Sequence, residues 1–116
     1  MKTPLHIAFY CSSTSWGGLE MNTVRYAGWM KEEGFVVSLY CVAQTPLHDE
    51  AVRSGLEVGI IRRNGKYFDL VNAWRVAKTF REAHVDVCWF RDTRDMDLLG
   101  WAKRFSGNRF RLLYQQ

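Results

Sequence analysis

A glycine-bearing turn is the part of this sequence best equipped for chemistry. It spans residues 12–20, reads Ser-Ser-Thr-Ser-Trp-Gly-Gly-Leu-Glu, and contains Trp16, Gly17, Gly18 and Glu20. Glycines between an apolar run and an amphipathic segment permit positive φ and the close approach of an anion to backbone N–H groups at a helix start. The turn therefore predicts a phosphate site. A plain structural turn, with Glu20 stabilising the helix dipole, is the alternative.

This turn matches none of the common nucleotide-binding signatures. Gly-x-Gly-x-x-Gly cannot be fitted to residues 15–20, and no Gly-Lys-Ser/Thr follows. A nicotinamide cofactor is therefore disfavoured, and we expect no bound cofactor.

The three cysteines offer no metal site. Cys11, Cys41 and Cys88 lie in or at the end of apolar runs, with no Cys-x-x-Cys pair and no histidine at ligand spacing. We expect no metal, and we expect reduced thiols in a cytosolic compartment.

A second polar segment, residues 91–97, mixes cations with carboxylates at Arg91, Asp92, Arg94 and Asp95. Paired donors and acceptors suit sugar hydroxyls, and arginine gives bidentate contacts to phosphate. We predict that these four residues bind an acceptor. Helix capping with solvated surface ion pairs is the alternative.

Lys66 and Tyr67 complete the predicted acceptor site. They follow Asn64 and Gly65, a pair typical of turns, and combine a cation with an aromatic ring that can stack on a sugar face.

Apolar runs and amphipathic segments alternate along the chain. The strands and helices that they predict must position the polar segments described above. The runs cover residues 5–11, 36–42, 56–61, 85–90 and 110–114. Runs of this length between helices are typical of βαβ units. The sequence predicts a three-layer, doubly wound α/β domain with a mainly parallel five-stranded sheet, whose ligands lie at the carboxyl ends of the strands.

Four helices are expected between the strands. The first ends at Gly34, the second covers residues 46–54 from Pro46 to an exit at Gly55, the third begins at Asp69, and the fourth covers residues 94–105. Helical spacing selects the side chains that should face the core: Thr23, Tyr26, Ala27 and Met30; Val71, Trp74, Val76, Ala77 and Phe80; and Leu98, Leu99, Trp101, Ala102 and Phe105.

Composition indicates one globular domain, residues 1–116, with 47% hydrophobic residues. The net charge is +4 and the pI about 9.1, without the basic run typical of nucleic-acid binding, so we expect no nucleic acid partner. No apolar run is long enough for a signal peptide or a membrane span. We expect a soluble cytoplasmic protein whose basic charge suits peripheral contact with the inner face of an anionic membrane.

The glycine turn resembles the start of family 4 glycosyltransferases, which read Gly-Gly-x-Glu, then a helix ending in Gly-His and a strand. Trp16 to Val37 carry the specific motif, and the β/α order extends the resemblance over the whole chain. Phe35 stands where the family usually has His, and Tyr26 where it usually has Leu.

The resemblance implies the N-terminal, acceptor-side half of a GT-B enzyme, in which two Rossmann-like domains face each other across a cleft. It implies a retaining transfer from a nucleotide-sugar to a glycan or lipid-linked acceptor, as in bacterial surface polysaccharide biosynthesis, without an obligatory metal. The loop at Gly17 and Gly18 would approach the donor diphosphate. The donor domain, with its Glu-x7-Glu motif, is missing from this sequence, so we expect the fragment alone to be inactive and the natural chain to continue for about 200 residues.

A second interpretation stays open, in which the chain is a stand-alone Rossmann-like or flavodoxin-like module that binds a phosphorylated ligand without catalysis.

Overall fold

The computed structural model describes residues 4–62 and 70–115. In these residues strands and helices alternate: β1 (His6–Cys11), α1 (Gly18–Glu32), β2 (Val36–Val42), α2 (Pro46–Arg53), β3 (Glu57–Ile61), α3 (Leu70–Glu82), β4 (Val87–Phe90), a 3-10 turn (Thr93–Asp95), α4 (Met96–Phe105) and β5 (Arg111–Tyr114). All five expected strands are present, and all except β2 begin one or two residues later than the apolar runs suggest.

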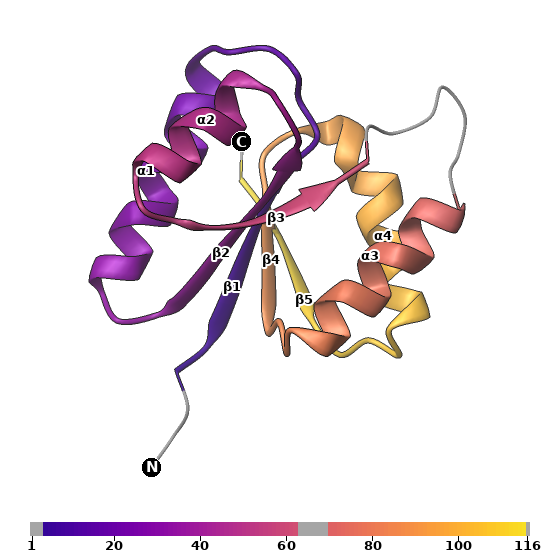
Figure 1. Cartoon of the computed structure of the whole chain (residues 1–116). Helices are drawn as coiled ribbons and strands as arrows, with labels where there is room; N and C mark the ends of the chain where they lie inside the picture. The colour runs from indigo at the N-terminus through magenta and orange to yellow at the C-terminus, as the bar shows by residue number, and fades with distance from the viewer. Residues whose placement is uncertain (1–3, 63–69, 116) are drawn as a thin grey trace.

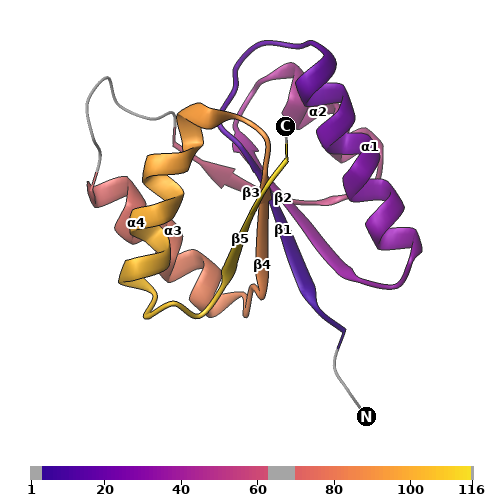
Figure 2. The ribbon, with the colours of Figure 1, turned by 180° about the vertical axis from the view of Figure 1, so that it is seen from behind.

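The strands form one parallel sheet in the order β3-β2-β1-β4-β5. Helices α1 and α2 cover one face of the sheet, and α3 and α4 cover the other (Figures 1 and 2). The prediction of a doubly wound, Rossmann-like α/β domain in three layers is therefore confirmed.

Strand residues alternate between two separate cores. Ile7 and Phe9 of β1 pack with the buried residues of α1 and α2, whereas Ala8 and Tyr10 pack with those of α3 and α4. Because the central strands are buried on both faces, their sequences read as continuous apolar runs.

The helix ends follow the predicted glycines and proline. Gly34 and Gly55 directly follow the C-cap residues of α1 and α2 and adopt φ values of +98° and +76°, a conformation that favours glycine. Pro46 lies in the first turn of α2, and the hydroxyl of Thr45 accepts a hydrogen bond from the N–H of His48 at 3.2 Å. The predicted N-cap Asp69 lies outside the described residues.

The predicted inner face of α1 is confirmed, but two predicted faces are partly wrong. Val71 and Trp74 of α3 are 63% and 54% exposed, and Trp101 and Phe105 of α4 are 37% and 40% exposed. The helices instead bury a narrower stripe made mainly of smaller side chains: Asn72, Ala73, Val76, Ala77, Phe80, Leu98, Leu99 and Ala102. Small side chains let α3, α4 and the sheet approach closely, and this leaves the indole rings outside.

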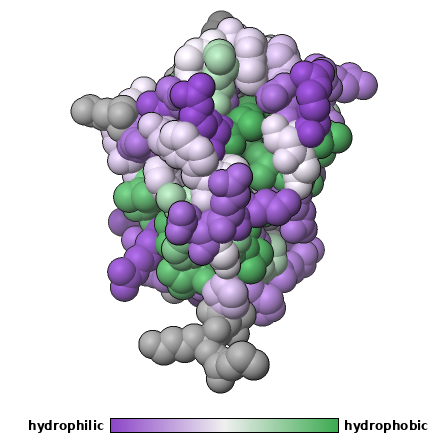
Figure 3. Space-filling view, turned by 90° about the vertical axis from the view of Figure 1, so that its left-hand side faces the viewer, coloured by the Kyte–Doolittle hydropathy of each residue, from purple (hydrophilic) through white to green (hydrophobic). Residues whose placement is uncertain are grey.

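The outer surface of α1 and α2 is of mixed polarity. Figure 3 views the molecule from the side that carries these helices. It shows hydrophilic side chains interrupted by separate apolar patches. Met21, Trp29 and Val52 are the exposed large apolar residues of the two helices. Among the described residues, no helix is long and apolar enough to cross a membrane.

All three cysteines are buried and free. Burial raises the pKa of Cys11 to about 12 and that of Cys41 to about 11, and it raises the pKa of Cys88 well above its usual value. The thiols are therefore protonated at neutral pH and poorly reactive.

Two substitutions on α3 test the observed face of this helix. Phe80→Ala should lower the free energy of unfolding by about 3–5 kcal/mol, because Phe80 is 1% exposed and packs edge-on against Tyr40 and Phe110. Trp74→Ala should lower it by less than about 1 kcal/mol, because the indole is half exposed. Urea unfolding followed by circular dichroism measures both. A loss of stability for Trp74→Ala as large as that for Phe80→Ala would show that Trp74 faces the core, as the helical spacing predicted.

Candidate functional site

The carboxyl ends of the neighbouring strands β1 and β4 are the point in the sheet from which the connections diverge. These neighbouring strands lead to helices on opposite faces, β1 to α1 and β4 to α4 (Figure 1). In open parallel sheets this divergence leaves a crevice in which ligands bind. Both polar segments singled out in the sequence, residues 12–20 and 91–97, begin here, and their parts before α1 and α4 are residues 12–17 and 91–95.

A buried carboxylate joins the two loops. Asp95 is fully buried, and its carboxylate accepts two hydrogen bonds from Ser12. One comes from the hydroxyl of Ser12 and the other from the backbone N–H of Ser12, at 3.3 Å. The N–H of Asp95 in turn donates to the carbonyl of Asp92 at 3.0 Å. Asp95, one of the predicted acceptor-binding residues, therefore holds the β1–α1 loop against the β4–α4 turn.

A second carboxylate organises the glycine turn itself. Glu20 is 5% exposed, and its Oε1 accepts hydrogen bonds from the hydroxyls of Ser13 at 2.6 Å and Ser15 at 3.2 Å. Its negative charge in the first turn of α1 also interacts favourably with the positive end of the helix dipole. Glu20 thus holds residues 12–15, which we call the serine loop, in place beside the start of α1.

Neither glycine of the turn has the backbone conformation suggested by the sequence. Gly17 is the extended N-cap of α1, with φ −168° and ψ −162°, and Gly18 does not have a positive φ. The expectation of positive φ was wrong because the chain enters α1 from extended backbone without a left-handed step.

The packing of this domain does not require glycine at these positions either. A Cβ at Gly18 would meet nothing within 4 Å, and one at Gly17 would lie 3.7 Å from Glu20 Oε2, an ordinary contact.

The start of α1 is therefore open. No side chain caps it, and its first backbone hydrogen bond runs from the N–H of Met21 to the carbonyl of Gly17 at 3.0 Å. The N–H groups of residues 18–20 precede that bond and have no acceptor within the helix. This arrangement attracts an anion.

Trp16 is turned toward α2. The residue is 42% exposed and lines two hollows of about 230 and 250 Å³. Glu50 lines both hollows, and Arg53 and Arg25 line one each. Trp16 thus offers an aromatic surface beside charged groups at the same edge of the sheet.

Arg91 lies on the α1 side of β4. Its guanidinium is 5.5 Å from the centre of the Tyr26 ring, which stacks on Trp89. The Nε and Nη1 atoms of Arg91 are buried and have no hydrogen-bond acceptor among the described residues. A buried cationic donor without an acceptor is unfavourable, so this guanidinium is prepared for an anion.

The remaining predicted residues are less informative. Asp92 is buried and joins Asp95 through its backbone carbonyl. Lys66 and Tyr67 lie outside the described residues, and so does the side chain of Arg94. Sequence reasoning missed Ser12, although a run of hydroxyl residues directly after a strand was a visible signal, and it treated Tyr26 as packing alone.

Within residues 4–62 and 70–115, no group of three or more His, Cys, Asp or Glu side chains could hold a metal ion. The polar groups described at this edge include the organising carboxylates of Glu20 and Asp95, the buried Asp92, the guanidinium of Arg91 and the open start of α1.

No protein-family model matches the sequence, and no curated protein sequence matches it. Solved structures do match the fold. A glycosyltransferase from Rickettsia africae superposes with a TM-score of 0.81 at 18% identity, over 97% of this chain and 30% of that one. MurG from Acinetobacter baumannii gives a TM-score of 0.76 at 15% identity, over 96% of this chain and 34% of MurG.

HepE from Anabaena, in complex with UDP and glucose, gives a TM-score of 0.67 at 18% identity, over 91% of this chain and 28% of HepE. The chain thus spans about a third of the length of each of these proteins. At these identities the likeness establishes the fold, which is that of one domain of these glycosyltransferases.

A pair of substitutions in the β4–α4 segment tests the role of Asp95. Asp95→Ala should lower the free energy of unfolding by about 1–3 kcal/mol, because Ser12 loses the acceptor for two hydrogen bonds. Asp97→Ala, which removes an exposed carboxylate from the first turn of α4, should lower it by about 0.5 kcal/mol. Urea denaturation measures both values. Equal losses would mean that Asp95 does not hold the two loops together.

Proposed function

We propose that this chain is the N-terminal, acceptor-side domain of a retaining GT-B glycosyltransferase. In this proposal the parent enzyme transfers a sugar from a nucleotide-sugar to a glycan or lipid-linked acceptor in bacterial surface polysaccharide biosynthesis. A C-terminal donor domain completes the site, and the domain alone is inactive. The fold likeness to glycosyltransferases supports the architecture.

The open start of α1 is the observation that carries the proposal. Gly17 and Gly18 have no side chains, the helix has no side-chain cap, and a Cβ at Gly18 would project into open space. The domain's own packing does not account for these glycines, and we attribute them to the close approach of a ligand from outside the domain. A donor diphosphate would accept hydrogen bonds from the free N–H groups, and the helix dipole would favour its negative charge.

Sugar transfer leaves charge on the departing diphosphate, and preorganised donors lower the energy of that state. The N–H groups at the start of α1 would serve as such donors, and the guanidinium of Arg91 has two more without acceptors. Glu20 and Asp95 act as positioning residues, because they hold the serine loop and the β4–α4 turn in place before the substrate arrives.

The acceptor would bind along the same edge. Trp16 offers a surface for a sugar ring, with Glu50 and Arg53 beside it to bond hydroxyl groups. Of the predicted acceptor residues, Asp92, Arg94, Lys66 and Tyr67 remain candidates for the acceptor site, whereas we assign Arg91 to the diphosphate and Asp95 to positioning. The net charge of +4 suits a cytoplasmic enzyme that contacts an anionic membrane to reach a lipid-linked acceptor.

Gly18→Val in the full-length protein tests the proposal. The variant should fold, because a Cβ at this position meets no atom of this domain. The valine side chain should block the diphosphate and lower kcat/KM by about 100-fold, as expected for misplaced reacting groups. The measurement is sugar transfer or donor hydrolysis with UDP-glucose and other nucleotide-sugars.

Gly28→Val is the matched control, since Gly28 lies in α1 with similarly open space, away from the helix start. It should retain the wild-type rate. A wild-type rate for Gly18→Val would contradict the assigned role of the turn. Binding of a nucleotide by the wild type without any transfer would favour the stand-alone module.

A further inference from the structure

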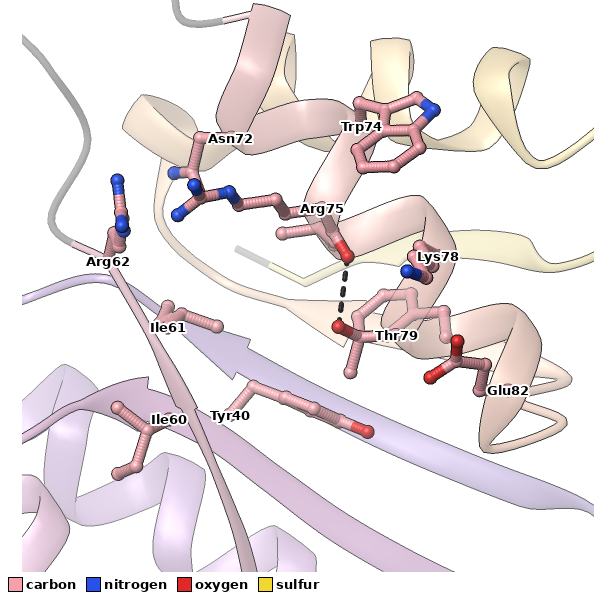
Figure 4. Close-up of a pocket in the computed structure, with 12 residues that line it drawn as sticks. Tyr40, Ile60, Ile61, Arg62, Asn72, Trp74, Arg75, Lys78, Thr79 and Glu82 are labelled. Atoms are coloured by element: carbon pink, nitrogen blue, oxygen red, sulfur yellow. Dashed lines mark hydrogen bonds between the residues drawn. The ribbon is translucent and has the colours of Figure 1, made fainter.

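A groove separate from the β1–β4 edge lies between β3 and α3. It has a volume of about 590 Å³, and Tyr40, Ile61 and Thr79 are among the residues that line it (Figure 4). The groove lies on the sheet face covered by α3, and it shares no residue with the loops at residues 12–17 and 91–95. Its size is typical of a small-molecule site.

The wall of the groove is cationic. Arg62, Arg75 and Lys78 line it, and Glu82 is the one acidic residue among the described residues of the lining. Arg62 and Arg75 direct their guanidinium groups toward the same end of the groove, beside Asn72 (Figure 4). No carboxylate of the described residues forms an ion pair with these three cations. Because like charges gathered without counterions repel each other, an anion in the groove would relieve that repulsion.

The floor of the groove is a fixed aromatic ring. Tyr40 lies directly against β3, where a Cβ at Gly59 would come within 2.4 Å of the ring. Phe80 packs edge-on against the same ring, with the ring centres 4.9 Å apart. Gly59 therefore makes room for the ring, and the surrounding contacts hold it in one orientation.

Apolar groups continue from the floor to the rim. Ile61 is buried beside Tyr40, while Ile60 and Trp74 are 55% and 54% exposed at the edges of the groove. The ammonium of Lys78 lies 5.6 Å from the centre of the Trp74 ring. The groove thus joins a rigid apolar surface to a cluster of cations that form no ion pair with any described residue.

We propose that this groove binds a phosphate ester with an apolar body. The phosphate would bind between Arg62 and Arg75, whose planar guanidinium groups match phosphate oxygens in a bidentate manner. The apolar body would lie against Tyr40 and Trp74, where the fixed floor reduces the entropy lost on binding. Two kinds of compound share this chemistry, an alkyl phosphate of the lipid type and a nucleoside monophosphate. The inference does not depend on sugar transfer.

Calorimetric titration of the full-length protein tests this proposal with four probes. These are n-octyl phosphate below its micellar concentration, uridine monophosphate, inorganic phosphate and the neutral octyl glucoside. At least one of the two phosphate esters should bind tenfold or more tightly than both inorganic phosphate and octyl glucoside. The tighter ester identifies the kind of ligand. Equal binding of all four probes, or binding of none, would overturn the proposal.

Variants locate the binding. Arg62→Ala combined with Arg75→Ala should weaken ester binding at least tenfold, whereas Arg81→Ala, an exposed arginine of α3 outside the groove, should change it less than twofold. Gly59→Ala displaces the Tyr40 ring. This variant should weaken the binding of the ester and leave the binding of inorganic phosphate unchanged. Equal losses for Arg81→Ala and the double variant would show unspecific attraction to the helix, and would contradict the site. Thermal melting checks that each variant is folded.

Discussion

The hydrogen bonds between Asp95 and Ser12 are the interaction on which the candidate site depends. A carboxylate with no solvent exposure is unfavourable unless its oxygens have donors, and the hydroxyl and N–H of Ser12 provide them. These two residues belong to loops that leave adjacent strands for opposite faces of the sheet. Their bond therefore fixes the crevice between the loops, and Glu20 extends the same principle to the serines that precede α1.

Much of the fold could be predicted, because the information is local. Central strands buried on both faces are largely apolar, and a turn with a φ of +98° after α1 favours glycine, which is present as Gly34. The inner faces of α3 and α4 could not be predicted in full. Hydrophobicity alone favoured Trp74 and Trp101, whereas close packing of the layers selected the small side chains of Ala73, Ala77 and Ala102.

The place of the candidate site at one edge of the sheet was predictable, but its internal geometry was not. Ligands of parallel sheets bind at the carboxyl ends of the strands, so the loops after β1 and β4 were identified from chain order. That Asp95 is buried, that Arg91 lies against Tyr26, and that Gly17 is extended all depend on contacts between distant segments. The groove beneath α3 was missed for the same reason, because Tyr40 and Gly59 meet only when β2 and β3 are paired.

The central claim is that the open start of α1 faces a diphosphate supplied from outside this domain. Hydrogen–deuterium exchange of the full-length protein, with and without a saturating nucleotide-sugar, tests it most directly. The account predicts slower exchange in residues 12–20 when the nucleotide-sugar is bound, because the N–H groups at the start of α1 gain acceptors. Unchanged exchange in these residues, with protection appearing elsewhere in the protein, would contradict it.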